Sequence, residues 1–216
     1  MHEQAMAWIA KYATSEPVTV LDIGGRNVNG SPRHLFFNTT TYTVLDIRPG
    51  DGVDIVADAA TWDPGGQVWD VIIAAETFEH TAQWRAICRT AYAACAPGGR
   101  LIVTTAAPGR PPHSAVDGEF RLLPGEHYAN IRPAELERVL AEAGWAGVVV
   151  DVQPSPADVR AVAVKEPGYA CRCGHPRTAH EHYTVPGDLR CGLCGCQKWH
   201  RRRTHEDNDA DLSERR

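Results

Sequence analysis

The sequence predicts an α/β protein: a doubly wound, mostly parallel seven-stranded sheet with a final antiparallel strand, followed by a small cysteine- and histidine-rich module. Short β-branched runs alternate with amphipathic helical segments, an order typical of a parallel sheet that helices cover on both faces. The last two strand-like runs are separated by little more than Pro154, Ser155 and Pro156, which favours a hairpin-like return. Beyond Pro167 the alternation stops.

The first half of the chain supplies one helix and four strands. Residues 2–13 have helical spacing, and Met6, Ile9 and Ala10 can share one face. Continuous β-branched runs are typical of strands that are buried on both faces of a sheet. The four predicted strands are VTVLDIG (18–24), TYTVLDI (41–47), VDIVADA (53–59) and WDVIIAA (69–75).

The second half supplies two helices and three strands. The Ala-rich segment 81–96 predicts a helix that stops at Pro97-Gly98-Gly99. Residues 133–144 predict another, because Pro133 suits a first helical turn and Gly144 suits a C-terminal stop. The remaining predicted elements are a strand at 100–107, a long Gly-, Pro- and His-rich loop at 108–130, and strands at 147–153 and 159–165.

Composition divides the chain near residue 166. We expect residues 1–166 to form the sheet domain, residues 167–203 the small module and residues 204–216 a disordered tail, since that tail has mixed charge and almost no apolar content. The formal net charge is −6 over residues 1–165 and +4 over residues 166–205. The second stretch could face a polyanion, or its charges could simply be solvated.

Two sequence features bear on the compartment. No apolar run approaches the roughly 20 residues that span a bilayer, so no membrane partner is expected. The N-terminal stretch MHEQAMAWIAKYATSEP lacks both a basic start and a continuous apolar block. A secretory signal is therefore not indicated, and a cytoplasmic location is expected.

Acidic residues and glycines gather where the first three strands end. Asp22 precedes the pair Gly24-Gly25, Asp46 ends the second strand, and Asp58 follows the third. Glycines let backbone amides approach a ligand closely, and a carboxylate can accept hydrogen bonds from two ribose hydroxyls. The dinucleotide fingerprint G-x-G-x-x-G is missing. A rim of carboxylates disfavours a diphosphate and suits a nucleoside that carries a positive sulfonium.

Residues 1–165 resemble the class I S-adenosylmethionine-dependent methyltransferases, through VLDIGG, VLDI, VADA, WDVIIAAETFEH and CAPGGRLIVTT. The resemblance implies a Rossmann-like fold and S-adenosylmethionine (SAM) as cofactor. Asp22, Gly24 and Gly25 would then line the methionine end of the cofactor. The other cofactor-binding residues that it implies are Asp46 with Ile47 at the ribose, Asp58 with Ala59 at the adenine, and Glu76, which is followed by Glu79 and His80. Arg26 and Val28 stand where the family has its second and third glycines.

The methyl acceptor and any catalytic residue stay open at this point. Methyl transfer depends mainly on positioning, and a general base is needed only if the acceptor loses its proton early. His80, Glu126, His127 and Tyr128 are the candidates for contact with the acceptor, either as acid–base groups or as binding and lid residues. The loop 108–130 would cover the substrate.

The C-terminal module predicts a structural zinc site. Cys191-x-x-Cys194 places two thiolates on one tight turn, and Zn²⁺ takes four tetrahedral Cys or His ligands. We favour Cys173, His180, Cys191 and Cys194, with Cys171 next, and about one zinc per chain. Spacing does not decide between these and the alternates His175, His182 and Cys196. The module resembles zinc ribbons and could dock nucleic acid or protein.

Three hypotheses of function follow. The leading one is a SAM-dependent methyltransferase whose acceptor is unknown and whose zinc module docks a substrate or partner. The second is a non-catalytic, methyltransferase-like adaptor that binds nucleic acid or protein through that module. The third, a nicotinamide-dependent oxidoreductase, is disfavoured by the missing fingerprint.

Overall fold

The computed structural model describes residues 1–167 of the 216-residue chain. Residues 1–166 form one compact unit. The predicted zinc module from residue 168 on, including all eight cysteine and histidine candidates for zinc, and the tail predicted to be disordered lie outside the described residues. Within residues 1–167, no helix has the length and apolar character needed to cross a membrane.

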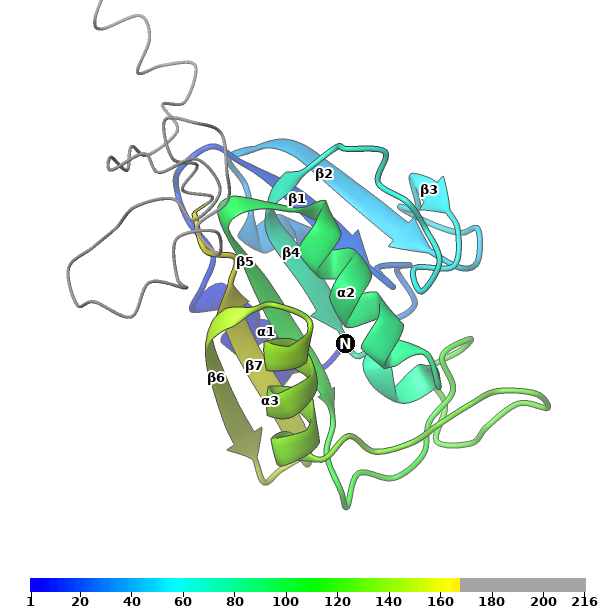
Figure 1. Ribbon diagram of the computed structural model, residues 1–216. Coiled ribbons are helices and arrows are strands. Elements are labelled where there is room, and N and C mark those ends of the chain that lie inside the picture. The colour runs from blue at the N-terminus through cyan, green and yellow to red at the C-terminus, as the bar shows by residue number, and fades with distance from the viewer. Residues whose placement is uncertain (168–216) are drawn as a thin grey trace, which may run out of the picture. The chain divides into compact units, whose positions relative to one another are not determined.

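A seven-stranded sheet in the order β3-β2-β1-β4-β5-β7-β6 forms the centre of this unit (Figure 1). Strands β1 to β5 run parallel to one another, whereas β7 is antiparallel to both of its neighbours, β5 and β6. The strands are β1 (Val18–Ile23), β2 (Thr39–Asp46), β3 (Ile55–Val56), β4 (Trp69–Ala75), β5 (Cys95–Ala106), β6 (Ala146–Gln153) and β7 (Asp158–Val164). The predicted mixed sheet with its final antiparallel strand is confirmed.

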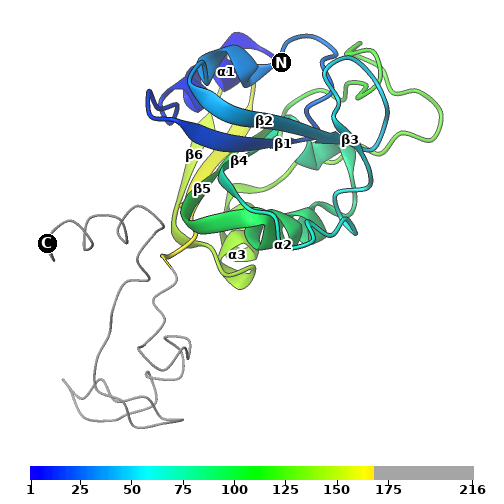
Figure 2. The same cartoon turned by 90° about the horizontal axis from the view of Figure 1, so that it is seen from above.

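Helices cover the two faces of the sheet unequally. Helix α1 (Glu3–Ala10) packs on one face, and α2 (Trp84–Ala94) and α3 (Pro133–Glu142) pack on the other (Figure 2). The α1 face has a small core that includes Trp8, Ile9 and Phe36. The opposite face has a larger core, to which both α2 and α3 contribute.

Several predicted boundaries differ from the structure: α2 ends at Ala94, three residues before Pro97, and α1 ends at Ala10. Two strand boundaries differ for identifiable reasons. The sequence predicts the third strand at 53–59, but β3 spans two residues. Val44 N donates to the Asp54 carboxylate at 2.8 Å. In a longer strand pair a backbone carbonyl would accept this hydrogen bond, so the side chain of Asp54 ends the pairing early. The strand predicted at 100–107 begins already at Cys95, which pairs with Trp69 ahead of an irregularity in the ladder.

The topology creates a crevice beside the central strands. The chain passes from β1 outward to β2 and β3 and then returns to β4 on the other side of β1. The loops that follow β1 and β4 therefore diverge, and ligands of doubly wound sheets bind at this kind of switch point, beyond the carboxyl ends of the strands.

Candidate functional site

A cavity of about 810 Å³ lies at that switch point. Its volume falls in the range of roughly 300–1,000 Å³ that is usual for small-molecule sites. The ends of β1 and β2 line it, together with residues that follow β4 and part of the loop between β5 and α3. Seven of the eight residues predicted to bind a cofactor line this cavity: Gly24, Gly25, Asp46, Ile47, Asp58, Ala59 and Glu76.

The glycine loop after β1 is packed so closely that side chains are excluded. Gly24 has a φ of +73°, and a Cβ on it would lie 2.4 Å from Thr77 Oγ1. A Cβ on Gly25 would lie 2.5 Å from the Asp22 carboxyl carbon. The loop therefore presents bare backbone to the cavity, as a cradle for a nucleoside or amino-acid ligand requires.

Asp22 lies beneath this loop rather than in the cavity. Its side chain is buried, and the Tyr42 hydroxyl donates a hydrogen bond to its Oδ2 at 2.8 Å. Burial raises the pKa of Asp22 to about 7, although the hydrogen bond from Tyr42 opposes the shift. Asp22 supports Gly25 from below, whereas the sequence predicts it at the methionine end of a cofactor.

Asp46 is fixed in place by its own backbone surroundings. Its Oδ1 accepts from Arg48 N at 2.9 Å, and its Oδ2 accepts from Arg26 N at 3.2 Å. Each carboxylate oxygen has two lone pairs, so both can accept a further hydrogen bond from a ligand. Asp58 is oriented similarly, because its Oδ1 accepts from Ala60 N at 2.9 Å.

Arg26, which occupies a glycine position of the usual motif, connects the glycine loop to the long loop. Its guanidinium donates to the carbonyl oxygens of Ala115 and Val116, at 2.8 and 3.2 Å. Glu126, a predicted acceptor contact, stabilises the long loop as well, because its carboxylate accepts from Ala115 N and from Leu123 N. The predicted loop at 108–130 has neither helix nor strand, and part of it lines the cavity.

Histidines and a tyrosine gather where the loop meets the segment after β4. His80 ends the short 3-10 helix η2 (Phe78–His80). Its ring packs edge-on against His113, with centroids 4.9 Å apart, and against Tyr128 at 5.6 Å. Burial, together with the nearby His113, lowers the pKa of His80 to about 4, so the ring is neutral. His127 lines the cavity, whereas Tyr128 lies behind the lining and packs against the rings of His80 and His113.

Glu79 is a fully buried carboxyl group behind this cluster. Burial and the negative charge of Glu76 together raise its pKa to about 8. Thr105 Oγ1 donates to its Oε2 at 2.6 Å, and Ala106 N donates to its Oε1 at 3.1 Å. The carboxyl is therefore held rigidly by β5.

An ion-pair network that the sequence does not predict contributes His2, Glu76 and Arg110 to the cavity lining. The Arg110 guanidinium pairs with Glu76 at 3.3 Å and also with the buried carboxylate of Asp158. The His2 imidazole lies 3.1 Å from Asp158 and 3.4 Å from Glu76. Burial alone would lower the pKa of His2, but its hydrogen bonds to the two carboxylates raise it to about 9. No local sequence signal connects these four residues.

Comparisons with known proteins give one family and many similar folds. The profile of a family described as a methyltransferase domain matches residues 1–150. No match was found among curated proteins.

Solved structures share the fold at low identity. One is the Burkholderia thailandensis 1,6-didemethyltoxoflavin-N1-methyltransferase with bound 1,6-didemethyltoxoflavin and S-adenosylhomocysteine, at a TM-score of 0.58 and 17% identity, over 76% of this chain and 77% of that one. Another is the complex of DhpI with SAH, at a TM-score of 0.57 and 22% identity, over 76% of this chain and 85% of that one. A third is Haemonchus contortus phosphoethanolamine N-methyltransferase 2 with SAM, at a TM-score of 0.58 and 13% identity. The match covers 76% of this chain and about half (52%) of that one.

Proposed function

Since its residues 1–150 match the profile, this chain belongs to the methyltransferase domain family, and we propose that it transfers a methyl group from SAM to an acceptor. One observation carries the proposal. The glycine cradle, Asp46 and Asp58 face a single cavity of about 810 Å³. Similar folds that were solved with SAM or S-adenosylhomocysteine support the choice of cofactor.

The residues present fit this cofactor. Gly24 and Gly25 line the cavity with backbone alone, and Asp46 has acceptor capacity for ribose hydroxyls. Asp58 and Ala59 would contact the adenine, and Ile47 would pack beside the ribose. SAM supplies a methyl group already activated by a positive sulfur. The task of the chain is to hold the acceptor in line and exclude water, and positioning of this kind can supply roughly 7–11 kcal/mol.

The acceptor would enter between the long loop and the segment after β4. His113 and His127 line the cavity from the loop, and His80 lines it from the opposite segment. A neutral histidine can accept a proton from an acceptor that must lose one. The adaptor hypothesis is not favoured, because the cavity is open and its glycine cradle is intact.

The direct test is titration calorimetry of the full chain with SAM. We expect binding, and a roughly 10- to 100-fold weaker affinity in Asp46→Ala, because hydrogen bonds to a charged group contribute about 1.5–3 kcal/mol. Asp63→Ala is the matched control, since Asp63 also accepts a backbone N–H, from Gly65, but does not line the cavity. Equal affinities in Asp46→Ala and the unmodified chain would contradict the ribose contact.

Transfer itself is tested with radiolabelled methyl groups. Incubation of the chain and labelled SAM with fractions of a cell extract, separated into small molecules, proteins and nucleic acids, should label one class. Tight cofactor binding without label in any fraction would instead support the adaptor hypothesis.

We also propose that residues 167–203 bind one structural zinc ion and dock a substrate or partner, either nucleic acid or protein. The support is the sequence alone: Cys191-x-x-Cys194 together with Cys171, Cys173 and His180, and with His175, His182 and Cys196 as alternates. Elemental analysis of protein purified without added metal should find about one zinc per chain, because a structural site closes with four ligands. Finding none would contradict this proposal.

A further inference from the structure

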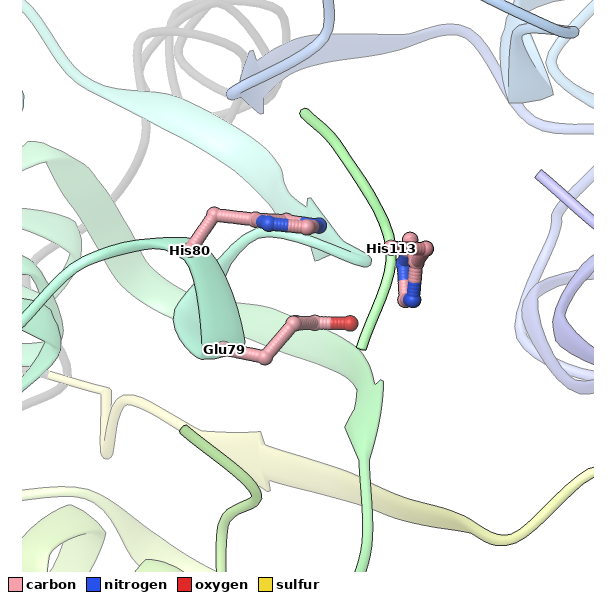
Figure 3. A group of neighbouring side chains, drawn as sticks. All are labelled: Glu79, His80 and His113. Atoms are coloured by element: carbon pink, nitrogen blue, oxygen red, sulfur yellow. The ribbon is translucent and has the colours of Figure 1, made fainter. Parts of the chain in front are cut away.

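Two histidines that line the cavity and a buried carboxyl group behind them have the composition and spacing of a metal site. Glu79 and His80 come from η2, and His113 comes from the long loop (Figure 3). One ligand atom from each lies within 4.8 Å of the other two. A carboxylate oxygen and two imidazole nitrogens form a common ligand set for divalent transition metals.

Glu79 is oriented as a ligand that is itself held by hydrogen bonds. Its partners, Thr105 Oγ1 and Ala106 N, are neutral donors. No ion pair within residues 1–167 includes Glu79. Hydrogen bonds of this kind fix the direction of a metal-binding carboxylate without neutralising it.

The two histidines each have a free position. His80 Nδ1 is buried and has no hydrogen-bond partner within the described residues. Such an atom requires an explanation, and an ion is one. His113 Nδ1 lies 3.3 Å from the carbonyl oxygen of Pro111. Because that oxygen can only accept, Nδ1 carries the proton and the lone pair is on Nε2, the arrangement typical of a metal-bound histidine.

A second cluster in the same wall provides an internal contrast. Single atoms of His2, Glu76 and Asp158 also lie within 4.8 Å of one another. There, however, the Arg110 guanidinium donates to both carboxylates. That cluster already holds a permanent positive charge, whereas the Glu79 cluster holds none.

We propose that Glu79, His80 and His113 bind one divalent transition-metal ion, of the class of Mn²⁺, Fe²⁺, Co²⁺ and Zn²⁺. Two imidazole ligands argue against Mg²⁺ and Ca²⁺, which prefer oxygen. Three protein ligands leave coordination positions open, and His80 and His113 line the cavity. The acceptor class that follows rests on the proposed function: the acceptor would be a molecule that offers the ion a hydroxyl or carboxylate oxygen.

The test uses the full chain, stripped of metal, with Mn²⁺ as the probe. Mn²⁺ favours oxygen and imidazole ligands over thiolates, so the C-terminal cysteines should contribute little. Electron paramagnetic resonance should count about one bound Mn²⁺ per chain. His113→Ala and Glu79→Gln should each weaken binding at least roughly tenfold, since even the loss of an outer-shell partner costs 10–100-fold.

His34→Ala is the matched control, because His34 is an exposed histidine whose ring contacts the carbonyl oxygen of Ser31. It should bind Mn²⁺ as the unmodified chain does. Absence of Mn²⁺ binding, or equal binding in His113→Ala, overturns the proposal. His113 is partly exposed on a loop, so this variant decides the matter even if Glu79→Gln fails to fold.

Separate titrations keep the two proposals distinguishable. Mn²⁺ binding without SAM binding would leave the metal site in place and remove the methyltransferase. SAM binding without any Mn²⁺ binding would support the methyltransferase and overturn the metal site. Co²⁺ adds a spectroscopic check: His113→Ala should remove the ligand-field bands of this site, and it should leave any thiolate charge-transfer band of the C-terminal cysteines unchanged.

Discussion

The two walls of the cavity are built by different means. The strand wall, which consists of Gly24, Gly25, Asp46 and Asp58, is formed by residues at the ends of parallel strands and is fixed by backbone hydrogen bonds. The loop wall, which consists of the residues around Glu79, His80, Arg110 and His113, is fixed by side chains that meet across long sequence distances.

The difference predicts different sensitivities. The strand wall does not tolerate an added side chain at Gly24 or Gly25, because Thr77 and Asp22 fill the space that a Cβ would need. The loop wall depends on buried charges, so the loss of one partner leaves another charge uncompensated. Substitutions in the two walls should therefore differ both in the size of their effect and in the property that they change.

Removal of the central cation should cause the greatest loss of stability. Arg110→Met leaves the carboxylates of Asp158 and Glu76 without their guanidinium partner, and Asp158 is fully buried. Breaking a buried pair in this way costs about 3–5 kcal/mol. Urea unfolding at neutral pH measures the change. The control Arg121→Met removes an exposed pair with Asp117 and should cost at most about 1 kcal/mol. Similar losses in both variants would show that the loop wall is not held by this cation.

A single methyl group tests the strand wall. Gly24→Ala places a Cβ 2.4 Å from Thr77 Oγ1 and strains a residue at a φ of +73°, so we expect a loss of about 2–3 kcal/mol together with weaker SAM binding. Gly52→Ala is the matched control, because Gly52 has a φ of +75° but an added Cβ would meet no atom within 4 Å. It should lose only the conformational part, about 1 kcal/mol, and bind SAM normally. Equal behaviour of the two variants would argue against steric exclusion at the cradle.

The sequence predicts the strand wall well because its information is local. Asp46 and Asp58 end short apolar runs, and the parallel order of those runs brings their carboxyl ends to one edge of the sheet. Asp22 shows the limit of this reasoning. Alternation along β1 does not reveal that its side chain lies under Gly25 and that Tyr42, twenty residues away, donates to it.

The loop wall can be predicted only in part. The position of His80 after β4 marks it as a candidate, yet its neighbour His113 lies in a loop without periodicity. Arg110 meets His2 across 108 residues and Asp158 across 48. Pairings of this kind depend on where a long loop crosses the sheet. No spacing in a single sequence records that path.

Titration of His2 tests the loop wall without removing a permanent charge. In the folded protein the pKa of His2 is about 9, above the usual 6.5. The charged imidazole therefore stabilises the fold fully below pH 6.5, and this stabilisation is lost as the pH rises through about 9. His2→Asn should therefore lose about 1–2 kcal/mol below pH 6.5, with some screening by solvent, and almost nothing above about pH 9. Urea unfolding across that range measures the difference. A gap between the two proteins that does not change with pH would exclude a charged His2.

The smallest expected effect lies where the walls meet. Arg26 belongs to the glycine loop but donates to the carbonyl oxygens of Ala115 and Val116 in the long loop. Arg26→Ala removes both hydrogen bonds, which should lower the free energy of local opening of the long loop by about 1 kcal/mol. Amide exchange in residues 114–126 should therefore rise roughly fivefold. Exchange in β1 and β4 should stay unchanged, because those strands keep their ladders. Arg48→Ala, at the same cavity rim, is the control. Equal exchange in both variants would mean that the long loop holds its position without the strand wall.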